Sequence, residues 1–232
     1  MSYSPATLRL LAAYWVKQGG VNLGIVGNTA HRQGYHLGRD RVFSAGGRGW
    51  GDYSVAYHRD KAGLSNAASA IDLGRLNGSL TELRKFSVWL VERCMSHAPG
   101  TQDIREIIYS PDGRRVFGYS ALSGSGSQPI LGYGDASHLT HTHISFFRDS
   151  ENLDKVGLFS PYFASAPASK PGARPVAKPV AKPTKPGKLY TVKAGDTLWR
   201  IAIRNLTTLG RIRALNPGIK DLIRPGQVIR VK

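Results

Sequence analysis

A proline- and lysine-rich stretch, residues 164–188, most strongly limits how this chain of 232 residues can fold. It contains six prolines, six lysine or arginine residues and no acidic residue, and the tetrapeptide PVAK occurs twice in succession. Such a composition cannot bury a core, and it favours an extended, polyproline-like backbone of about 3.1 Å per residue. The sequence therefore predicts two folded units, residues 1–162 and 189–232, joined by a stiff linker over residues 163–188.

The remaining composition narrows the class of protein. The formal net charge is +17, and the linker and the C-terminal segment carry most of the excess basic residues. A basic tail is compatible with nucleic acid. However, no aromatic residues alternate with the basic ones and no nucleic-acid-binding motif is present, so we expect no nucleic acid as a partner. On charge alone, an anionic polymer surface such as a bacterial wall fits equally well. The single cysteine, Cys94, excludes an internal disulfide and a cysteine-based zinc cluster.

The first unit mixes helical and strand patterns. Apolar residues recur at helical spacing over residues 5–18 and 79–97. The stretch REIIYSPDGRRVFGY, residues 105–119, reads as two strands joined by a Pro-Asp-Gly turn, and THTHISFFR, residues 140–148, alternates as a final strand. The sequence therefore predicts an α+β fold with a small antiparallel sheet.

The C-terminal segment has the pattern strand, helix, helix, strand. Strands are expected at residues 189–192 and 227–231 and helices at 197–204 and 206–215, with Pro-Gly pairs marking turns. The segments YTVKAGDTLWRIA and LNPGIKDLIRPGQVIRV resemble the two halves of a LysM domain, in its order and at its separation. The resemblance implies a βααβ fold that binds N-acetylglucosamine-containing glycans, peptidoglycan or chitin.

The same resemblance places the glycan between two loops of this segment. The alternative is that Asp196 only caps a helix and that Leu198 and Ile219 only belong to the core. The glycan-binding residues that the resemblance implies are Gly195, Asp196, Thr197 and Leu198 in the first loop, and Asn216, Pro217, Gly218 and Ile219 in the second.

Three of the seven histidines lie within GDASHLTHTHISFF, residues 134–147. His141 and His143 are two residues apart in a predicted strand and so share one face, and His138 at the strand entrance can approach the same point. Imidazoles on one face suit zinc, which at a catalytic site takes three protein ligands and keeps one position open. A polar strand face without any metal is the alternative.

A further candidate is Asp72, within SNAASAIDLG at residues 65–74. Its neighbours Ile71 and Leu73 are apolar, and a carboxylate buried in such surroundings needs a metal or a hydrogen-bonding partner. A helix cap or a salt bridge would satisfy the carboxylate without a metal.

Together, SAIDLG and HLTHTH resemble two blocks of the zinc D-Ala-D-Ala carboxypeptidase and murein endopeptidase superfamily, in the same order. The signature of that superfamily is HxxGxAxD followed by a late HxH, and one branch carries HxxHxH. The resemblance implies that Asp72 and His143 bind zinc, and that His138 and His141 are proton-transfer groups beside it.

The chain departs from that signature at the first ligand, because Ser65 stands seven residues before Asp72, where the superfamily has histidine. Two upstream histidines could replace it. His36 lies among glycines, in a loop that can bend a side chain into a site, whereas His58 has basic neighbours that disfavour a dication. We therefore expect the zinc ligands to be His36, Asp72 and His143.

These resemblances predict an enzyme of the endolysin or autolysin type, which hydrolyses a peptide bond of peptidoglycan with zinc and is anchored to wall glycan by the LysM domain. His138 is the expected general base, because an ordinary imidazole pKa of about 6.5 suits proton transfer near neutrality. Glu106 is a possible carboxylate substitute, and Arg39 or Arg59 could bind carboxylates of the peptide.

Three other functional classes compete with this hypothesis. One is a non-catalytic peptidoglycan-binding protein whose first domain is a degenerate peptidase. Another is a muramidase, for which no spacing singles out a catalytic pair among Asp52, Asp60 and Glu106. A two-histidine phosphoesterase is the least favoured, because its two HxT/S elements lie far apart in sequence, whereas HLT and HIS overlap within one strand here.

The N-terminal residues MSYSPATLRLLAAYWVKQGG lack the basic segment and the uninterrupted apolar stretch of a secretion signal. The chain contains no run of the roughly 18 apolar residues that a membrane span needs. We therefore expect a monomer without membrane insertion, made in a host cytoplasm and released to the wall through a holin-type pore or by lysis.

Overall fold

The computed structural model divides the chain into two compact units, Met1–Pro167 and Ala168–Lys232. The structure describes residues 1–123 and 129–165 of the first unit. The described residues of the second unit are 188–193, 196, 198, 201, 205, 209–219 and 223–231. Most of the predicted linker, residues 166–187, therefore lies outside the described residues.

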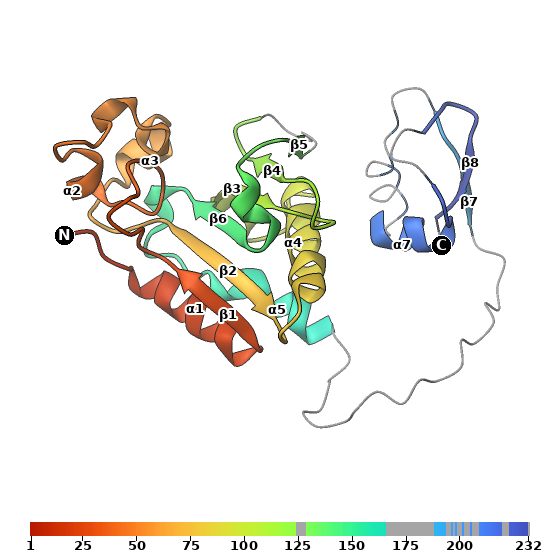
Figure 1. Cartoon of the computed structure of the whole chain (residues 1–232), viewed down its shortest axis with the longest axis horizontal. Coiled ribbons are helices and arrows are strands. Elements are labelled where there is room, and N and C mark those ends of the chain that lie inside the picture. The colour runs from red at the N-terminus through yellow and green to blue at the C-terminus, as the bar shows by residue number, and fades with distance from the viewer. Residues whose placement is uncertain are drawn as a thin grey trace. The chain divides into compact units, whose positions relative to one another are not determined.

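A six-stranded antiparallel sheet forms the centre of the first unit (Figure 1), as the sequence predicts for an α+β fold. The strands run in the order β1-β2-β6-β3-β4-β5. Their bounds are β1 Gly20–Gly24, β2 Ala70–Leu76, β3 Ile104–Tyr109, β4 Phe117–Ser120, β5 Ile130–Leu131 and β6 Thr142–Phe146.

Three helices, α1 (Ala6–Lys17), α4 (Leu80–Met95) and α5 (Val156–Ser165), pack together beside this sheet. An aromatic cluster joins them: the ring of Phe86 on α4 lies 4.8 Å from Trp15 on α1 and 4.7 Å from Phe159 on α5, between ring centroids. The hydroxyl groups of Ser87 on α4 and Thr142 on β6 lie 2.6 Å apart. The Thr142 side of β6 therefore faces the helices, and the next residue, His143, points to the opposite face.

Residues 25–69, which contain the short helices α2 (Arg39–Val42) and α3 (His58–Ala62), contact the opposite face of the sheet: His36 lies beside His143 and the Tyr53 hydroxyl donates to Glu106. The buried Arg148, just after β6, holds this segment in place. Its guanidinium donates to the carbonyl oxygens of Leu37, Ser54 and Ala67. A charged donor that is buried among carbonyl groups fixes their positions firmly, because any displacement leaves it unpaired.

The predicted helices and the predicted hairpin of the first unit are confirmed, with helix ends within two residues of the expectation. Two boundaries differ. A 3₁₀ helix, Ala136–Leu139, precedes β6, so the last strand begins at Thr142 and His141 lies just before it. Helix α5 continues beyond residue 162, and the partly buried Phe163 ring packs against Trp15 and Phe86.

The second unit contains β7 (Leu189–Thr191) and β8 (Val228–Arg230), which pair antiparallel, and α7 (Leu209–Leu215). Of the first predicted helix, Leu198 and Ile201 are described, and both are helical. The predicted strand and helix order is thus found where the structure describes it. Among the described residues, the core of this unit includes Val192, Leu198, Ile201, Ile212, Ile229 and Val231.

Across the described parts of both units, none of the helices has the length and apolar character to cross a bilayer.

Candidate metal centre

His36, Asp72 and His143 meet on the sheet face that residues 25–69 contact. Asp72 on β2 and His143 on β6 are direct cross-strand partners, so the antiparallel register sets their side chains next to each other. His36 comes from the loop before α2, more than a hundred residues away from His143 in sequence. One nitrogen or oxygen atom of each residue lies within 4.8 Å of those of the other two.

The spacing of these atoms suits one tetrahedral cation. Nε2 of His36 is 3.1 Å from Nδ1 of His143 and 3.2 Å from Oδ2 of Asp72, and Nδ1 of His143 is 3.0 Å from Oδ1 of Asp72. Zinc binds such atoms at about 2.0–2.1 Å, which puts neighbouring tetrahedral ligands about 3.3 Å apart. The three side chains thus have the chemistry and separation of a zinc-binding triad with one side left for a further ligand.

Further hydrogen bonds orient both imidazoles. Nδ1 of His36 donates to the carbonyl oxygen of Ile25 at 2.6 Å, which directs Nε2 toward Asp72. Nε2 of His143 lies 2.7 Å from Oγ of Ser145, and the Ser145 hydroxyl donates to Glu106 at 3.2 Å. Such contacts on the far side of the ring are typical of metal-binding histidines.

The electrostatics of the triad reflect these contacts. Burial alone would raise the pKa of Asp72, but hydrogen bonds from His143 and His36 and their positive charge hold it well below its usual range. Burial acts to lower the pKa of His36, yet the hydrogen bond and charge of Asp72 outweigh it and raise that pKa above the ordinary value. In the absence of a cation, a proton on His36 therefore pairs with the Asp72 carboxylate.

Five of the seven histidines gather around this point. His138 on the 3₁₀ helix has its ring centroid 4.6 Å from that of His141 and 6.1 Å from that of His143. Nε2 of His141 lies 3.9 Å from Oδ1 of Asp72. His31 packs its ring 5.6 Å from that of His36. Sequence reasoning missed His31, because its position in an irregular loop carries no periodicity that would assign it to the site.

His36, and not His58, lies beside Asp72 and His143. The Ser65 hydroxyl donates to Glu151 at 2.6 Å and accepts from the Ala67 backbone N–H, so residue 65 faces away from the triad. His58 is exposed at the start of α3, where its ring packs on Tyr57.

The carboxylates considered as alternatives have other partners. Glu106 approaches Nε2 of His143, 3.8 Å away, and so lies on the far side of that ring from Asp72 and His36. From there it cannot act as a base at the open side of the triad. Asp52 accepts from the backbone N–H groups of Gly34 and Ser54. Asp60 accepts from the hydroxyl of Tyr35. No carboxylate pair suited to a muramidase emerges from these three residues.

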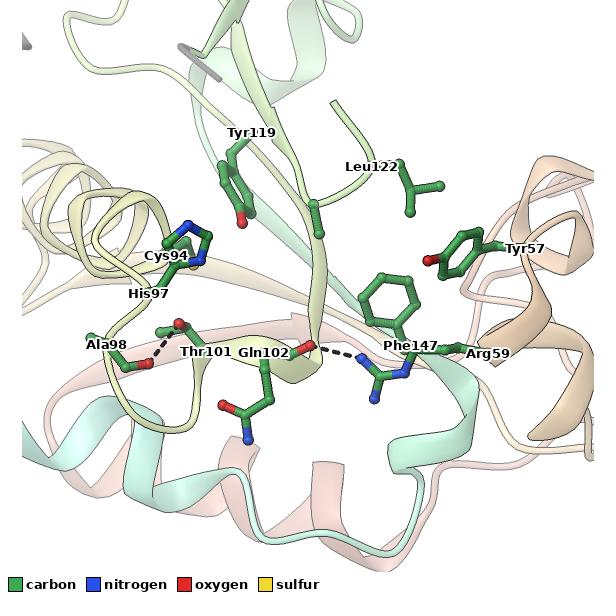
Figure 2. A pocket seen from close by; sticks show the side chains of 11 residues that line it. Tyr57, Arg59, Cys94, His97, Ala98, Thr101, Gln102, Tyr119, Leu122 and Phe147 are labelled. Atoms are coloured by element: carbon green, nitrogen blue, oxygen red, sulfur yellow. Dashed lines mark hydrogen bonds between the residues drawn. The ribbon is translucent and has the colours of Figure 1, made fainter. Parts of the chain in front are cut away.

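Arg59 is also engaged elsewhere, because its guanidinium binds Asp103 and Asp149, each at 2.7 Å. It lines a cavity of about 260 Å³ together with Tyr57 and Phe147, and Figure 2 shows Cys94 and His97 across the cavity from them. None of the five gathered histidines lines this cavity. Arg39, the other candidate for binding a peptide carboxylate, is exposed on α2.

In the second unit, side chains of the predicted glycan loops hold the fold together. Asp196 accepts from the Tyr190 hydroxyl at 2.8 Å and from the Lys193 backbone N–H at 2.9 Å. Leu198 is buried in the core, and Ile219 is partly buried against it.

The second predicted glycan loop begins at Asn216, whose amide bonds the backbone of Arg230 and so joins the end of α7 to β8. Pro217 and Gly218 are exposed beside it. Gly195 and Thr197 lie outside the described residues. Glycan contact at these eight positions stays a prediction.

The described parts thus define an α+β unit with a centre of two histidines and one carboxylate, and a second unit in which helical residues lie between two paired strands. Residues 190–232 match the LysM domain family, so the C-terminal unit is a LysM domain, a peptidoglycan-binding module, as its sequence predicts. The chain is 46% identical over 46 residues to the probable autolysin LDP of Staphylococcus aureus (strain NCTC 8325 / PS 47), and 49% identical over 47 residues to the endolysin of Bacillus phage PZA.

Both alignments are short. They cover 20% and 19% of this chain, and the chain spans only 16% and 18% of the lengths of these two relatives. The similarity to both relatives comes through the LysM region, and no solved structure matches the chain.

We predict that His36 in the metal-free protein titrates above the ordinary value of 6.5 and that Asp72→Asn moves its pKa below 6.5. The variant removes the hydrogen bond and the charge that raise this pKa, and burial then dominates. NMR titration of the imidazole signals measures both values, with His36→Gln for assignment. Asp135→Asn, which alters an exposed carboxylate beside His138, is the control. A His36 pKa that stays unchanged in Asp72→Asn would contradict this account.

Proposed function

We propose that the chain is a cell-wall lytic enzyme of the endolysin or autolysin type, in which the first unit is a zinc-dependent peptidase acting on peptidoglycan. The observation that carries this proposal is the triad of His36, Asp72 and His143, whose ligand atoms lie 3.0–3.2 Å apart. The resemblance of this unit to the zinc D-Ala-D-Ala carboxypeptidase and murein endopeptidase superfamily gives the reaction class, and the LysM domain gives the polymer.

In this proposal His36 and His143 each bind the ion through one ring nitrogen and Asp72 binds through its carboxylate. Three protein ligands leave a position for water or substrate. When bound, zinc supplies a Lewis acid that polarises the scissile carbonyl group and acidifies water.

His138 is the proposed general base. Its Nδ1 lies 3.2 Å from the carbonyl oxygen of Asp135, so Nδ1 donates and Nε2 is left to accept a proton. Burial, followed by the charges of His141 and His143, lowers its pKa. A lowered pKa keeps the imidazole neutral at physiological pH, as a base requires.

His141 is the proposed second proton-transfer group. Its Nδ1 donates to the carbonyl oxygen of Ser137 at 3.0 Å, and its Nε2 faces Asp72. The ring therefore adjoins both His138 and Asp72, where it can help to orient the reacting water.

The LysM domain would hold the enzyme on its polymeric substrate. The linker before it carries six basic residues and no acidic one, and this charge adds attraction to anionic wall polymers. Binding at a second site raises the effective concentration of the catalytic unit at the wall.

The alternative function is a non-catalytic peptidoglycan-binding protein with a degenerate first domain. Ser65 favours it, because the superfamily places its first ligand at this position. The presence of His36 beside Asp72 and His143 favours the enzyme, since it supplies the missing type of ligand from another segment.

We predict one zinc ion per chain in the wild-type protein and a loss of affinity of at least about 100-fold in His36→Ala, since even residues behind a metal ligand contribute 10–100-fold. Metal analysis after dialysis gives the stoichiometry, and competition with a chelator gives the affinity. His58→Ala is the matched control and should retain zinc. Zinc lost from His58→Ala but kept by His36→Ala would overturn the assignment.

We predict that the protein releases peptide fragments with new amino termini from purified peptidoglycan, that a chelator stops the release, and that zinc restores it. His138→Ala should lower kcat by about 10²–10⁴-fold with its zinc content unchanged, because it removes a general base. Mass spectrometry of the digests identifies the fragments. New reducing sugar ends with intact peptides would exclude a peptidase, and no digestion at all by the zinc-loaded protein would favour the non-catalytic alternative.

We predict that Gly218→Val weakens pelleting with insoluble peptidoglycan by about tenfold. Gly218 has a φ of +83° in the second predicted glycan loop, and a branched residue there costs about 1–2 kcal/mol, which distorts the loop. Gly226→Val is the control, because Gly226 has a φ of +86° and lies outside both predicted loops. Equal loss of binding in both variants would show that general destabilisation, and not glycan contact, is responsible.

A further inference from the structure

We propose that Glu106, acting through Ser145, is a positioning residue that selects the form of His143 able to bind the metal. The inference rests on the metal centre proposed above and assigns a role to a buried carboxylate that belongs to neither the triad nor the base. All three residues lie on paired strands of the sheet, Glu106 on β3 and both Ser145 and His143 on β6.

The three side chains form a continuous chain of hydrogen bonds. Nε2 of His143 lies 2.7 Å from Oγ of Ser145, and Oγ of Ser145 lies 3.2 Å from Oε1 of Glu106. Oε1 of Glu106 is itself 3.8 Å from Nε2 of His143, so the direct gap is too long for a hydrogen bond and the serine bridges it.

The carboxylate is held away from solvent in a fixed orientation. Glu106 has only 1% of its surface exposed. Its Oε2 accepts from the Tyr133 hydroxyl at 2.6 Å and lies 3.9 Å from Arg105. Its Oε1 accepts hydrogen bonds from the Ser145 hydroxyl and, at 3.3 Å, from the Tyr53 hydroxyl. Because one oxygen is anchored by Tyr133, the other faces the serine and His143.

The direction of these hydrogen bonds explains why a carboxylate stands here. A serine hydroxyl alone could either donate to Nε2 of His143 or accept from it. A carboxylate can only accept, so Glu106 takes the serine proton and leaves Oγ of Ser145 as an acceptor. When a metal ion takes the place of the proton between Nδ1 of His143 and Asp72, the remaining ring proton would be held on Nε2 by Oγ of Ser145. Nδ1, which faces Asp72 and His36, would then offer its lone pair to the metal.

The same geometry predicts what happens when the carboxylate is lost. In Glu106→Gln, the amide can present its NH₂ group to Ser145, and the serine can then donate to Nε2 of His143. That arrangement favours the form of His143 with its proton on Nδ1, which blocks metal binding. In Ser145→Ala, the bridge is absent and the carboxylate lies too far from the ring to replace it.

The test measures the affinity of the full-length chain for zinc alone, by competition with a chelator, in the wild type, Glu106→Gln, Ser145→Ala and the double variant. We expect each single variant to bind zinc 10–100-fold more weakly, in the range found for residues behind metal ligands. We expect the double variant to bind no more than about threefold more weakly than the more affected single variant, because both substitutions break one chain of hydrogen bonds.

Ser87→Ala is the matched control. Ser87 on α4 is fully buried, as Ser145 is, but its hydroxyl contacts Thr142 on the helix side of β6, the side opposite to His143. It should leave zinc affinity unchanged. The melting temperature of each metal-free variant is measured alongside its zinc affinity. If Ser87→Ala also weakens zinc binding, and the loss of affinity in both serine variants follows their loss of melting temperature, Ser145 contributes only to general packing and the proposal is overturned.

The remaining outcomes separate this inference from the proposed function. Wild-type zinc affinity in Glu106→Gln and Ser145→Ala, or penalties that multiply in the double variant, would overturn the positioning role while the metal centre stands. A wild-type chain that binds no zinc would overturn the metal centre, and this role with it. If Glu106→Gln does not fold, the comparison of Ser145→Ala with Ser87→Ala decides the question. Removal of the Ser145 hydroxyl alone must then weaken zinc binding 10–100-fold.

Discussion

The pairing of β2 with β6 is the constraint on which the candidate centre depends. In this register Asp72 lies opposite His143, while the adjacent Ile71 lies opposite Ile144 on the side of the helices. A slip of β2 by one residue would turn the Asp72 carboxylate into the helix-packed core and Ile71 out of it. Burial of apolar surface, at about 25 cal/mol per Å², opposes that slip. The hydrophobic core thereby sets the distance between two polar side chains on the other face of the sheet.

The third member of the triad depends on a different kind of interaction. His36 sits in a loop, where no strand partner sets its position. The loop is held by Arg148, whose guanidinium bonds the carbonyl oxygens of Leu37 and Ser54, and by the contact of His36 with Ile25. A buried guanidinium ties the loop to the end of β6, the strand that carries His143. Arg148 therefore fixes the position of the loop relative to the sheet, which keeps His36 close to Asp72 and His143.

The parts of the structure that could be predicted from sequence are those with local signals. The LysM domain was accessible because two long motifs occur in order, and the helices because apolar residues recur at helical spacing. Asp72 and His143 stood out because polar groups in apolar or alternating stretches need an explanation. The location of His36 in the site needed the structure to decide it against His58, since a loop carries no periodicity. Nothing local in the sequence connects Glu106 to Ser145, because strand pairing alone brings them together.

The single thiol of the chain has a consequence for the setting in which such a protein can work. Cys94 is buried on α4, and burial raises its pKa well above the ordinary value, so the reactive thiolate form is scarce. With no second cysteine in the sequence, the chain cannot form an internal bridge, and the buried thiol is a poor partner for one between molecules. A change from a reducing to an oxidising medium therefore neither forms nor breaks a disulfide within this chain.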